Sequence, residues 1–243
     1  MDIIINGANG RMGRILDETI GQGGAHRVAA RVDWSYAASD GLSTLSQYEG
    51  PADVVIDFSN HTATAQVLDY CAQRKLPVVI ATTGQTEEEL RLIDDAAKVI
   101  PVFLSANMSI GVALLAQLAK KTASVFPDAD IEIIERHHNQ KLDVPSGTAL
   151  LLARRIQEAR PQAKLVVGRH ENGKRAPEEI GIHSLRYGGE VGTHEIIVAA
   201  GGETITLKHE AENRSLFARG ALAAAEFLAE QAPGMYDMRS IIE

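Results

Sequence analysis

Three glycines follow the first apolar run of the sequence at even spacing. They are Gly7, Gly10 and Gly13, and an amphipathic stretch begins within this turn. Small residues let the main chain approach a pyrophosphate closely, and the free N–H groups at a helix N-terminus favour its negative charge. The pattern is Gly-x-x-Gly-x-x-Gly, because Ala8 occupies the usual place of the second glycine. It predicts the phosphate-binding turn of a dinucleotide site.

An acidic residue stands where such a site needs one. Asp33 ends the second apolar run, 20 residues after Gly13. A carboxylate at this position accepts hydrogen bonds from the adenosine ribose and repels a 2′-phosphate, which favours NADH over NADPH. Arg11 and Arg31 could weaken that preference. The alternative is a plain tight turn between strand and helix, with Asp33 as a surface carboxylate.

The densest group of chemically capable side chains lies in residues 135–148. His137, His138 and Lys141 precede Ser146-Gly147-Thr148, which opens an apolar helical stretch. In an extended chain the two histidines point to opposite faces, so they are poorly placed to chelate one metal, and we expect no metal site. Hydroxyls and free N–H groups at a helix N-terminus form an anion site suited to a carboxylate. The alternative is an ordinary helix cap with solvated histidines.

The elements that position these residues alternate through the first half of the chain. Short apolar runs separated by longer amphipathic ones indicate βαβ units and a parallel sheet. We expect strands at 3–5, 28–32, 54–58, 77–81 and 102–104, and helices at 11–20, 62–74 and 87–98.

The pattern changes near Ser109. A polar stretch, 161–181, precedes segments of period 2, and Gly201-Gly202 joins the last two of these in a hairpin. We expect helices at 110–125, 148–158 and 216–230, and strands at 131–135, 182–187, 195–200 and 204–210. The predicted fold is α/β, with a Rossmann-type doubly wound parallel sheet and a second, smaller α+β domain that carries a mixed or antiparallel sheet. The dinucleotide-binding domain spans 1–107 and is joined by 214–243, and the substrate-binding and oligomerisation domain spans 108–213.

Composition limits the partners and the compartment. The 243 residues carry a net charge of -8 without a concentrated basic patch, so we expect no nucleic acid, and the basic stretch 168–175 is interpreted as a solvated loop. One cysteine, Cys71, excludes an internal disulfide. The N-terminus has only three apolar residues before its turn, and no run approaches the ~18 apolar residues of a membrane span. We expect a cytoplasmic protein without a membrane segment.

Residues 135–148 closely resemble the E-x-H-H-x-x-K-x-D-x-P-S-G-T-A signature of the dihydrodipicolinate reductase family. Residues 7–13 are similar to that family's G-A-x-G-R-M-G turn, and residues 81–84 to its G-T-T-G loop, with Ala81 in place of the first glycine. The resemblance spans nearly the whole chain. Further similar segments are 107–111, 191–195 and 214–221.

The resemblance implies an enzyme that uses NADH or NADPH to reduce 4-hydroxy-tetrahydrodipicolinate, giving tetrahydrodipicolinate in the diaminopimelate route to lysine. It implies that His137 donates or accepts a proton and that Lys141 donates one. The implied contacts of the dicarboxylate substrate are His138, Ser146, Gly147 and Thr148. The implied cofactor residues are Gly7, Ala8, Asn9, Gly10, Arg11, Met12, Asp33, Ala81, Thr82, Thr83, Ser105, Ala106, Asn107 and Met108.

The resemblance also bears on cofactor choice and assembly. Trp34 stands where some members of the family carry an arginine that can hold the 2′-phosphate, which supports NADH. The family further implies a homotetramer built through the sheet of the second domain. Binding of cofactor and substrate to different domains predicts closure about hinges near Asn107 and Arg214.

Other classes fit less well. No tyrosine has a lysine four residues later, as a short-chain dehydrogenase requires. Cys71 lies inside a predicted helix, where a buried hydrophobic role fits better than that of the nucleophile of a phosphorylating aldehyde dehydrogenase. A non-catalytic NAD(H)-sensing module would keep the glycine turn and Asp33, but it would not need the histidines and Lys141.

Overall fold

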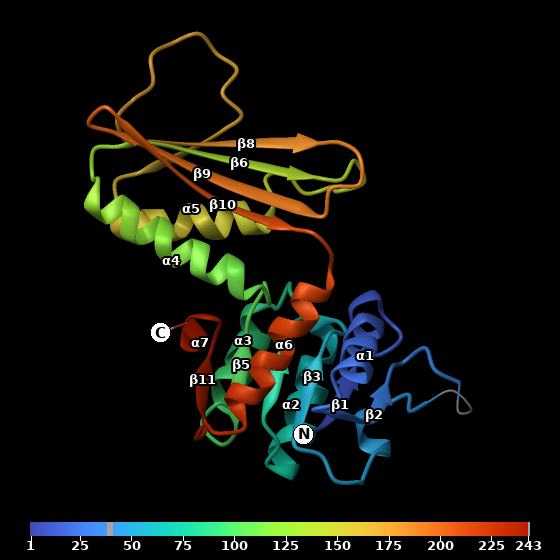
Figure 1. Cartoon of the computed structure of the whole chain (residues 1–243). Helices are drawn as coiled ribbons and strands as arrows, with labels where there is room; N and C mark the ends of the chain where they lie inside the picture. Colours follow the sequence, from blue (N-terminus) through green and yellow to red (C-terminus); the bar gives the residue numbers. More distant parts are fainter. Residues whose placement is uncertain (38–40, 243) are drawn as a thin grey trace. The chain divides into compact units, whose positions relative to one another are not determined.

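The computed structural model describes residues 1–37 and 41–242. The chain divides into two compact units, one of Met1–Ile110 with Arg214–Glu243 and one of Gly111–Asn213 (Figure 1).

The first unit contains a parallel sheet with the strand order β11-β5-β4-β3-β1-β2. Its strands are apolar runs because helices cover both faces, and Ile3, Ile4 and Ile5 of β1 are fully buried. The order reverses at β1, which lies between β2 and β3, and ligands bind at the carboxyl ends of strands beside such a reversal. The strands are β1 Asp2–Asn6, β2 Arg27–Val32, β3 Val54–Asp57, β4 Val78–Ile80, β5 Pro101–Leu104 and β11 Gly234–Tyr236.

The helices of this unit form two layers. Side chains of α2 and α3 pack on one face of the sheet together with Ile4, Val55 and Val78. On the other face, α1 and α6 contact each other and the strands (Figure 1). This arrangement confirms the predicted Rossmann-type fold. The helices are α1 Arg11–Gly23, α2 Thr64–Arg74, α3 Glu87–Ala96, α6 Ser215–Leu228 and α7 Arg239–Ile242, with short 3-10 helices η1 Leu45–Gln47 and η2 His61–Ala63.

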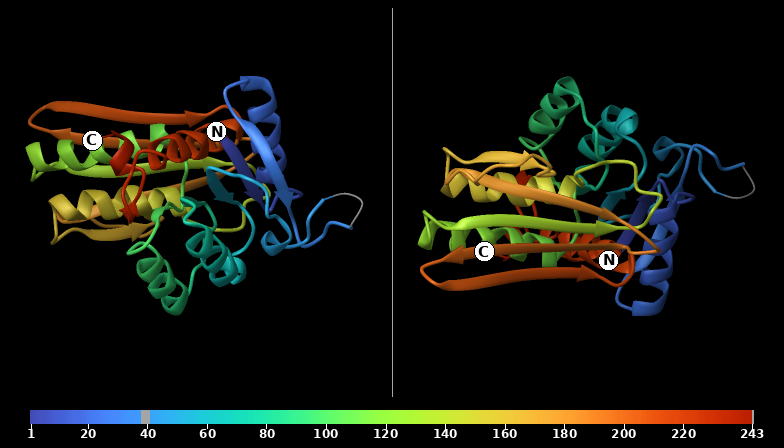
Figure 2. Two further views of the ribbon diagram at one scale, coloured as in Figure 1. Left: turned by 90° about the horizontal axis from the view of Figure 1, so that it is seen from below. Right: turned by 90° about the horizontal axis from the view of Figure 1, so that it is seen from above.

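The second unit contains a mixed sheet with the order β10-β9-β6-β8-β7, as predicted for an α+β domain. β6, β7 and β8 run parallel, while β9 is antiparallel to both β6 and β10. Helices α4 and α5 lie along one face, where Ile131 and Ile133 of β6 pack against Leu152 and Ile156 of α5 (Figures 1 and 2). The elements are α4 Ile110–Val125, β6 Asp130–His137, α5 Gly147–Ala159, β7 Lys164–Val167, β8 Glu179–Arg186, β9 Gly192–Ala200 and β10 Glu203–Ala211.

Some features differ from the prediction. Strand β7 lies in the stretch expected to be polar, and β11 and α7 were not predicted, because runs of three or four residues carry no readable period. The expectation of a solvated loop is wrong for Arg175, whose side chain is mostly buried and pairs with Asp130 and Glu132. Within the described residues, none of the helices has the length and hydropathy needed to cross a membrane.

Candidate active site

The turn between β1 and α1 leaves no room for side chains at two of its glycines. Gly7 has a positive φ of 82°, and a Cβ on it would lie 2.7 Å from the backbone of Phe58. A Cβ on Gly13 would lie 2.2 Å from the Gly7 carbonyl oxygen. Gly10 is the N-cap of α1 and has no side chain to accept from the first N–H groups of the helix. The turn is therefore a main-chain cradle of the kind that receives a pyrophosphate.

Asp33 connects this cradle to the turn after β2. Its Oδ2 accepts the Asn9 backbone N–H at 3.0 Å, and its Oδ1 accepts the N–H and the hydroxyl of Ser35 at 3.0 and 2.6 Å. Burial opposes the charged form, but the hydrogen bonds from Ser35 and Asn9 outweigh it and lower the pKa of Asp33. The carboxylate is therefore ionised near neutral pH, and Oδ2 keeps capacity for a further hydrogen bond, such as one from a ribose hydroxyl.

A second aspartate, which the sequence analysis did not single out, joins β1 to β3. Asp57 is fully buried at the end of β3, where its Oδ1 accepts from the Asn6 side chain at 2.8 Å and from the Ser59 hydroxyl at 2.5 Å. Burial raises its pKa. These bonds hold together the carboxyl ends of two strands that border the candidate cofactor site. The sequence signal was an acidic residue that ends an otherwise apolar run.

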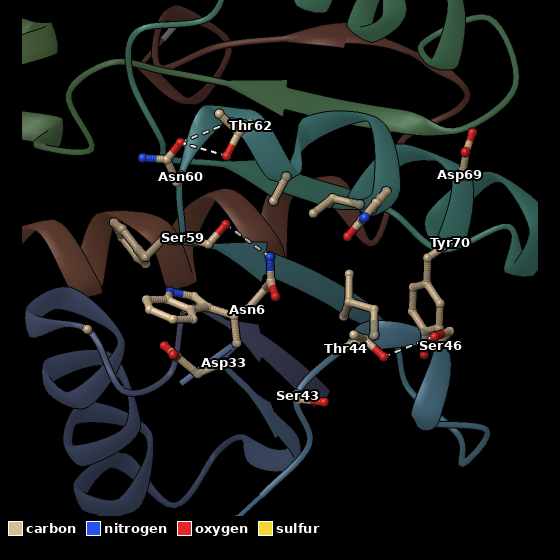
Figure 3. A pocket seen from close by; sticks show the side chains of 18 of the residues that line it. Asn6, Asp33, Ser43, Thr44, Ser46, Ser59, Asn60, Thr62, Asp69 and Tyr70 are labelled. Carbon is tan, nitrogen blue, oxygen red and sulfur yellow. Dashed lines mark hydrogen bonds between the residues drawn. The ribbon is translucent and has the colours of Figure 1, made fainter. Parts of the chain in front are cut away.

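A pocket of about 1000 Å³ extends from these strand ends. Figure 3 shows Asp33 and Asn6 toward one end of it and Ser46 and Tyr70 toward the other. Among the residues described as lining it, Asp33 and Asp69 are the charged ones, and both are acidic. Of the predicted cofactor residues, the lining includes Gly7, Gly10 and Asp33.

The other predicted cofactor residues lie beside this pocket or after neighbouring strands of the same sheet. Ala8, Asn9, Arg11 and Met12 belong to the β1–α1 turn and the first turn of α1. Ala81, Thr82 and Thr83 follow β4, and the Thr82 hydroxyl accepts from the Gln85 amide at 2.8 Å. Ser105, Ala106, Asn107 and Met108 follow β5, where the Ser105 hydroxyl donates to the Asn107 carbonyl at 2.8 Å. Since β3, β4 and β5 are adjacent and parallel, these two loops emerge at the same edge of the sheet as the pocket.

In the second unit, a buried carboxylate holds one of the two histidines. Glu135 of β6 is fully buried, and its Oε2 lies 2.6 Å from Nδ1 of His137. Both oxygens also accept from the Arg186 guanidinium at 2.7 and 2.8 Å, and Oε1 accepts the Ser146 N–H at 3.1 Å. Burial alone would raise the pKa of Glu135, but the hydrogen bonds from His137 and Arg186 outweigh it and hold that pKa well below its usual range. Because Glu135 is ionised, Nδ1 of His137 carries the proton.

The opposite side of the His137 ring faces the start of β9. A Cβ on Gly192 would lie 2.9 Å from His137 Nε2, so glycine at this position keeps space beside that nitrogen. Neither Glu135 nor Arg186 nor Gly192 was assigned a role from the sequence. Glu135 was visible as the first residue of the motif at 135–148, and Gly192 as part of the similar segment 191–195.

Ser146 caps helix α5 and contacts a third histidine. Its hydroxyl accepts the Ala149 N–H at 3.1 Å and lies 2.9 Å from Nε2 of His194. The His194 ring is buried, with its centroid 5.2 Å from that of His137. Burial, followed by the positive charge that His137 can carry, lowers the pKa of His194 to about 3. His194 is therefore neutral near pH 7, and its Nε2 shares a hydrogen bond with the Ser146 hydroxyl.

The loop between β6 and α5 carries the remaining predicted residues. Lys141 is mostly buried, and its Nζ lies 2.8 Å from Oδ1 of Asp143. His138 is half-buried, and its backbone N–H donates to the Glu190 carbonyl at 2.8 Å. Gly147 and Thr148 form the first turn of α5, where Gly147 is exposed. The structure thus joins His137 to Ser146 through Glu135, and it places Lys141 in the adjoining loop.

Taken together, the glycine cradle with its ionised aspartate and the histidine–carboxylate pair, with a lysine in the adjoining loop, are typical of a dinucleotide-dependent oxidoreductase. Family profiles described as "Dihydrodipicolinate reductase, N-terminus" and "Dihydrodipicolinate reductase, C-terminus" match residues 1–108 and 111–242. The chain belongs to the dihydrodipicolinate reductase family.

Individual relatives agree with this assignment. The chain is 45% identical to a 4-hydroxy-tetrahydrodipicolinate reductase of Caldanaerobacter subterraneus over 99% of this chain and 98% of that one. It is 43% identical to one of Clostridium tetani over 97% of this chain and 94% of the other. Among solved structures, the dipicolinate-bound dihydrodipicolinate reductase of Paenisporosarcina sp. TG-14 superposes with a TM-score of 0.80 at 28% identity, covering 98% of this chain and 97% of that chain. The family resemblance and the expectation of a reductase are confirmed.

Proposed function

We propose that this chain reduces 4-hydroxy-tetrahydrodipicolinate to tetrahydrodipicolinate with a hydride from NADH, in the route to diaminopimelate and lysine. The observation that carries the proposal is the buried Glu135–His137 pair beside Lys141 and the N-terminus of α5, in a member of this reductase family. The relative from Paenisporosarcina binds dipicolinate, a planar dicarboxylate with a similar distribution of charge.

The N-terminal unit would hold the cofactor. The positions of Gly7 and Gly13, where a Cβ would collide with backbone, fit a bound pyrophosphate, and Asp33 fits the ribose hydroxyls. When bound, a reduced nicotinamide supplies the hydride for this reaction. The residues that would hold it are 7–12, Asp33, 81–83 and 105–108.

The preference for NADH follows from charge. Asp33 is ionised, and within the described part of the chain neither lysine nor arginine lines the pocket. Arg31 is the nearest arginine in sequence, and both nitrogens of its fork are bound to Asp17, at 2.7 and 2.8 Å. A 2′-phosphate would therefore meet the negative charge of Asp33, while the nearby Arg14, whose charge helps to lower the pKa of Asp33, has its guanidinium bound to the Asn9 side chain at 2.6 Å.

The second unit would hold the substrate carboxylates. The loop before α5 supplies the ammonium of Lys141 and the imidazole of His138. The start of α5 supplies hydroxyls and backbone N–H groups, from Ser146, Gly147 and Thr148. Lys141 would exchange Asp143 for a substrate carboxylate. A charge-assisted hydrogen bond of this kind contributes roughly 1.5 to 3 kcal/mol.

The same unit would supply the proton that completes the reduction. Glu135 holds the Nδ1 side of His137, which leaves Nε2, beside Gly192, to face the substrate. As the imidazolium, His137 would deliver the proton from Nε2 and keep the Nδ1 proton that Glu135 holds, and Lys141 is the other donor that this loop offers. Glu135 acts through His137 and is therefore a positioning residue.

We also propose that the chain is a cytoplasmic homotetramer, built through the face of the second sheet that α4 and α5 leave uncovered. Side chains alternate along β6, so Ile134 lies on the face opposite to the buried Ile131 and Ile133, and Leu185 of β8 is 41% exposed. The same face also carries ion pairs between neighbouring strands, so an interface there would combine apolar and charged side chains. Sedimentation equilibrium tests this, with a mass of four chains expected and a monomer contradicting it.

The test of the activity follows NADH oxidation by near-ultraviolet absorbance, with 4-hydroxy-tetrahydrodipicolinate generated in the cuvette. Rapid oxidation that is faster with NADH than with NADPH, and is blocked by pyridine-2,6-dicarboxylate, is the expected result. Binding of NADH without turnover would overturn the substrate assignment and favour a sensing role.

A further inference from the structure

The sequence contains a single tryptophan, and the structure leaves its side chain in solvent. Trp34 is 86% exposed, the second-largest exposed fraction among the large hydrophobic side chains of the described chain, and it lines the pocket described above. An indole offers a large flat apolar surface that gains stability when it is covered. Such an exposed ring in the lining of a pocket is suited to stacking against a flat ring of a ligand.

The backbone that carries Trp34 is held in place on both sides. The Tyr36 N–H donates to the Asp33 carbonyl at 3.0 Å and closes a turn around Trp34. Ser35 donates its N–H and its hydroxyl to the Asp33 carboxylate, and the Asn9 side chain donates to the Ser35 hydroxyl at 2.9 Å. Trp34 is therefore tied to the same carboxylate, and to the same glycine-rich turn, that would receive the dinucleotide.

The position of Trp34 next to Asp33 indicates which part of a dinucleotide it meets. Asp33 accepts from ribose hydroxyls, so a ring attached to that ribose reaches the adjacent residue. We propose that Trp34 is the stacking surface for the adenine ring of the cofactor, and that it supports the binding of an adenosine without a 2′-phosphate. This inference rests on the proposed use of NADH.

The charges of the pocket are consistent with recognition by stacking. Asp33 and Asp69 are the charged side chains among the described lining residues, so this lining offers no lysine or arginine to bind a 2′-phosphate near Asp33. Stacking of a base on an aromatic side chain requires no charged partner, and its loss weakens binding by about 5- to 150-fold.

Because Trp34 is the single tryptophan, its fluorescence reports on this surface alone. The wild-type protein is titrated with AMP, ADP-ribose and nicotinamide mononucleotide, which lacks adenine. We expect AMP and ADP-ribose to quench the emission, nicotinamide mononucleotide to leave it unchanged, and adenosine 2′,5′-bisphosphate to bind at least about tenfold more weakly than AMP. Unchanged emission at saturating ADP-ribose would overturn the proposal.

Two variants separate a stacking role from a structural one. Trp34→Ala should raise the Kd for NADH by about 5- to 150-fold, and Trp34→Phe, which keeps a ring, should recover most of the affinity. Exposure of the side chain makes unfolding of either variant unexpected, and circular dichroism checks this. Equal affinity of Trp34→Ala and wild type for NADH, with the wild type turning over its substrate, would contradict the stacking role and leave the proposed function standing. Failure of the wild type to bind NADH would contradict both.

Discussion

The turn after β1 and the end of β6 present different kinds of contact surface. At the turn, the contact surface is main chain, kept open by glycines whose Cβ positions are occupied by Phe58 and Gly7 backbone atoms. At the end of β6, the contact surface consists of charged and imidazole side chains, kept in place by the fully buried carboxylate of Glu135. The first kind of surface is suited to recognising shape, and the second kind is suited to moving protons and balancing charge.

This difference predicts that the two regions fail in different ways. An added methyl group should harm the turn and reduce the affinity for the cofactor. Loss of one charge should harm the end of β6 and reduce the rate at bound cofactor. Each prediction below tests one side of this comparison, from the largest expected effect to the smallest.

The largest effect is expected for Lys141→Ala. Removal of the ammonium takes away a carboxylate partner and a proton donor, and general acid catalysis contributes about 10²- to 10⁴-fold. We expect kcat/KM for the substrate to fall on that scale while the Kd for NADH is unchanged. Lys121→Ala, on the exposed side of α4, is the matched control. Turnover of Lys141→Ala at the wild-type rate would remove this lysine from the mechanism.

Glu135→Gln should cost both stability and rate. It leaves the Arg186 guanidinium and the His137 ring without their ionised partner, and breaking a buried ion pair costs about 3 to 5 kcal/mol. Urea unfolding measures the loss. The double variant Glu135→Gln/Arg186→Met should recover stability but not kcat, because the uncompensated charge is gone while His137 still lacks its carboxylate. Recovery of kcat in the double variant would show that Glu135 has only a structural role.

Gly13→Ala tests the main-chain side of the comparison. The new Cβ would lie 2.2 Å from the Gly7 carbonyl oxygen, so the turn must shift. If the displaced turn weakens cofactor binding by about 1 to 3 kcal/mol, the typical cost of overpacking, the Kd for NADH rises about 5- to 150-fold. Fluorescence titration measures this Kd. The matched control is Gly21→Ala in the same helix, where a Cβ meets nothing within 4 Å. The control should bind NADH normally and gain up to about 1 kcal/mol of stability.

The effect that is smallest near neutral pH, and grows only in acid, is a pH dependence of stability that arises from His194. Burial lowers the pKa of His194 from 6.5 to about 3. Between these values the His194 ring binds a proton in the unfolded chain but not in the folded chain. This contribution makes the free energy of unfolding fall with decreasing pH, by about 1.4 kcal/mol per unit between pH 6.5 and 3. His194→Gln should lose that part of the slope, whereas His170→Gln, on an exposed loop, should keep it. Equal slopes for His194→Gln and wild type would contradict the neutral assignment.

The two regions also differ in how far the sequence predicts them. The glycine turn and Asp33 follow from local spacing, because a strand, a turn and a helix are consecutive in the chain. The surroundings of Glu135 do not, since its partner Arg186 and its cross-strand neighbour His194 come from strands β8 and β9, more than 45 residues away along the chain. Their meeting depends on strand order and register, in which Glu135 pairs with Ser184 on one side and His194 on the other.

The fold itself was largely predictable because parallel strands that are buried on both faces consist of continuous apolar runs, which are visible in the sequence. The strands that were missed, β7 and β11, are edge strands of three or four residues. Their pairing is set by the neighbouring strand more than by their own pattern.

The most direct test of the account is a single-turnover experiment in which NADH is bound first and 4-hydroxy-tetrahydrodipicolinate is then mixed in. The amplitude of the absorbance change measures bound NADH, and its rate measures the chemistry. The account predicts that Glu135→Gln keeps the wild-type amplitude and loses rate, while Gly13→Ala, at a subsaturating concentration of NADH, loses amplitude. A wild type that shows no absorbance change, or a Glu135→Gln variant that loses amplitude and keeps its rate, would contradict it.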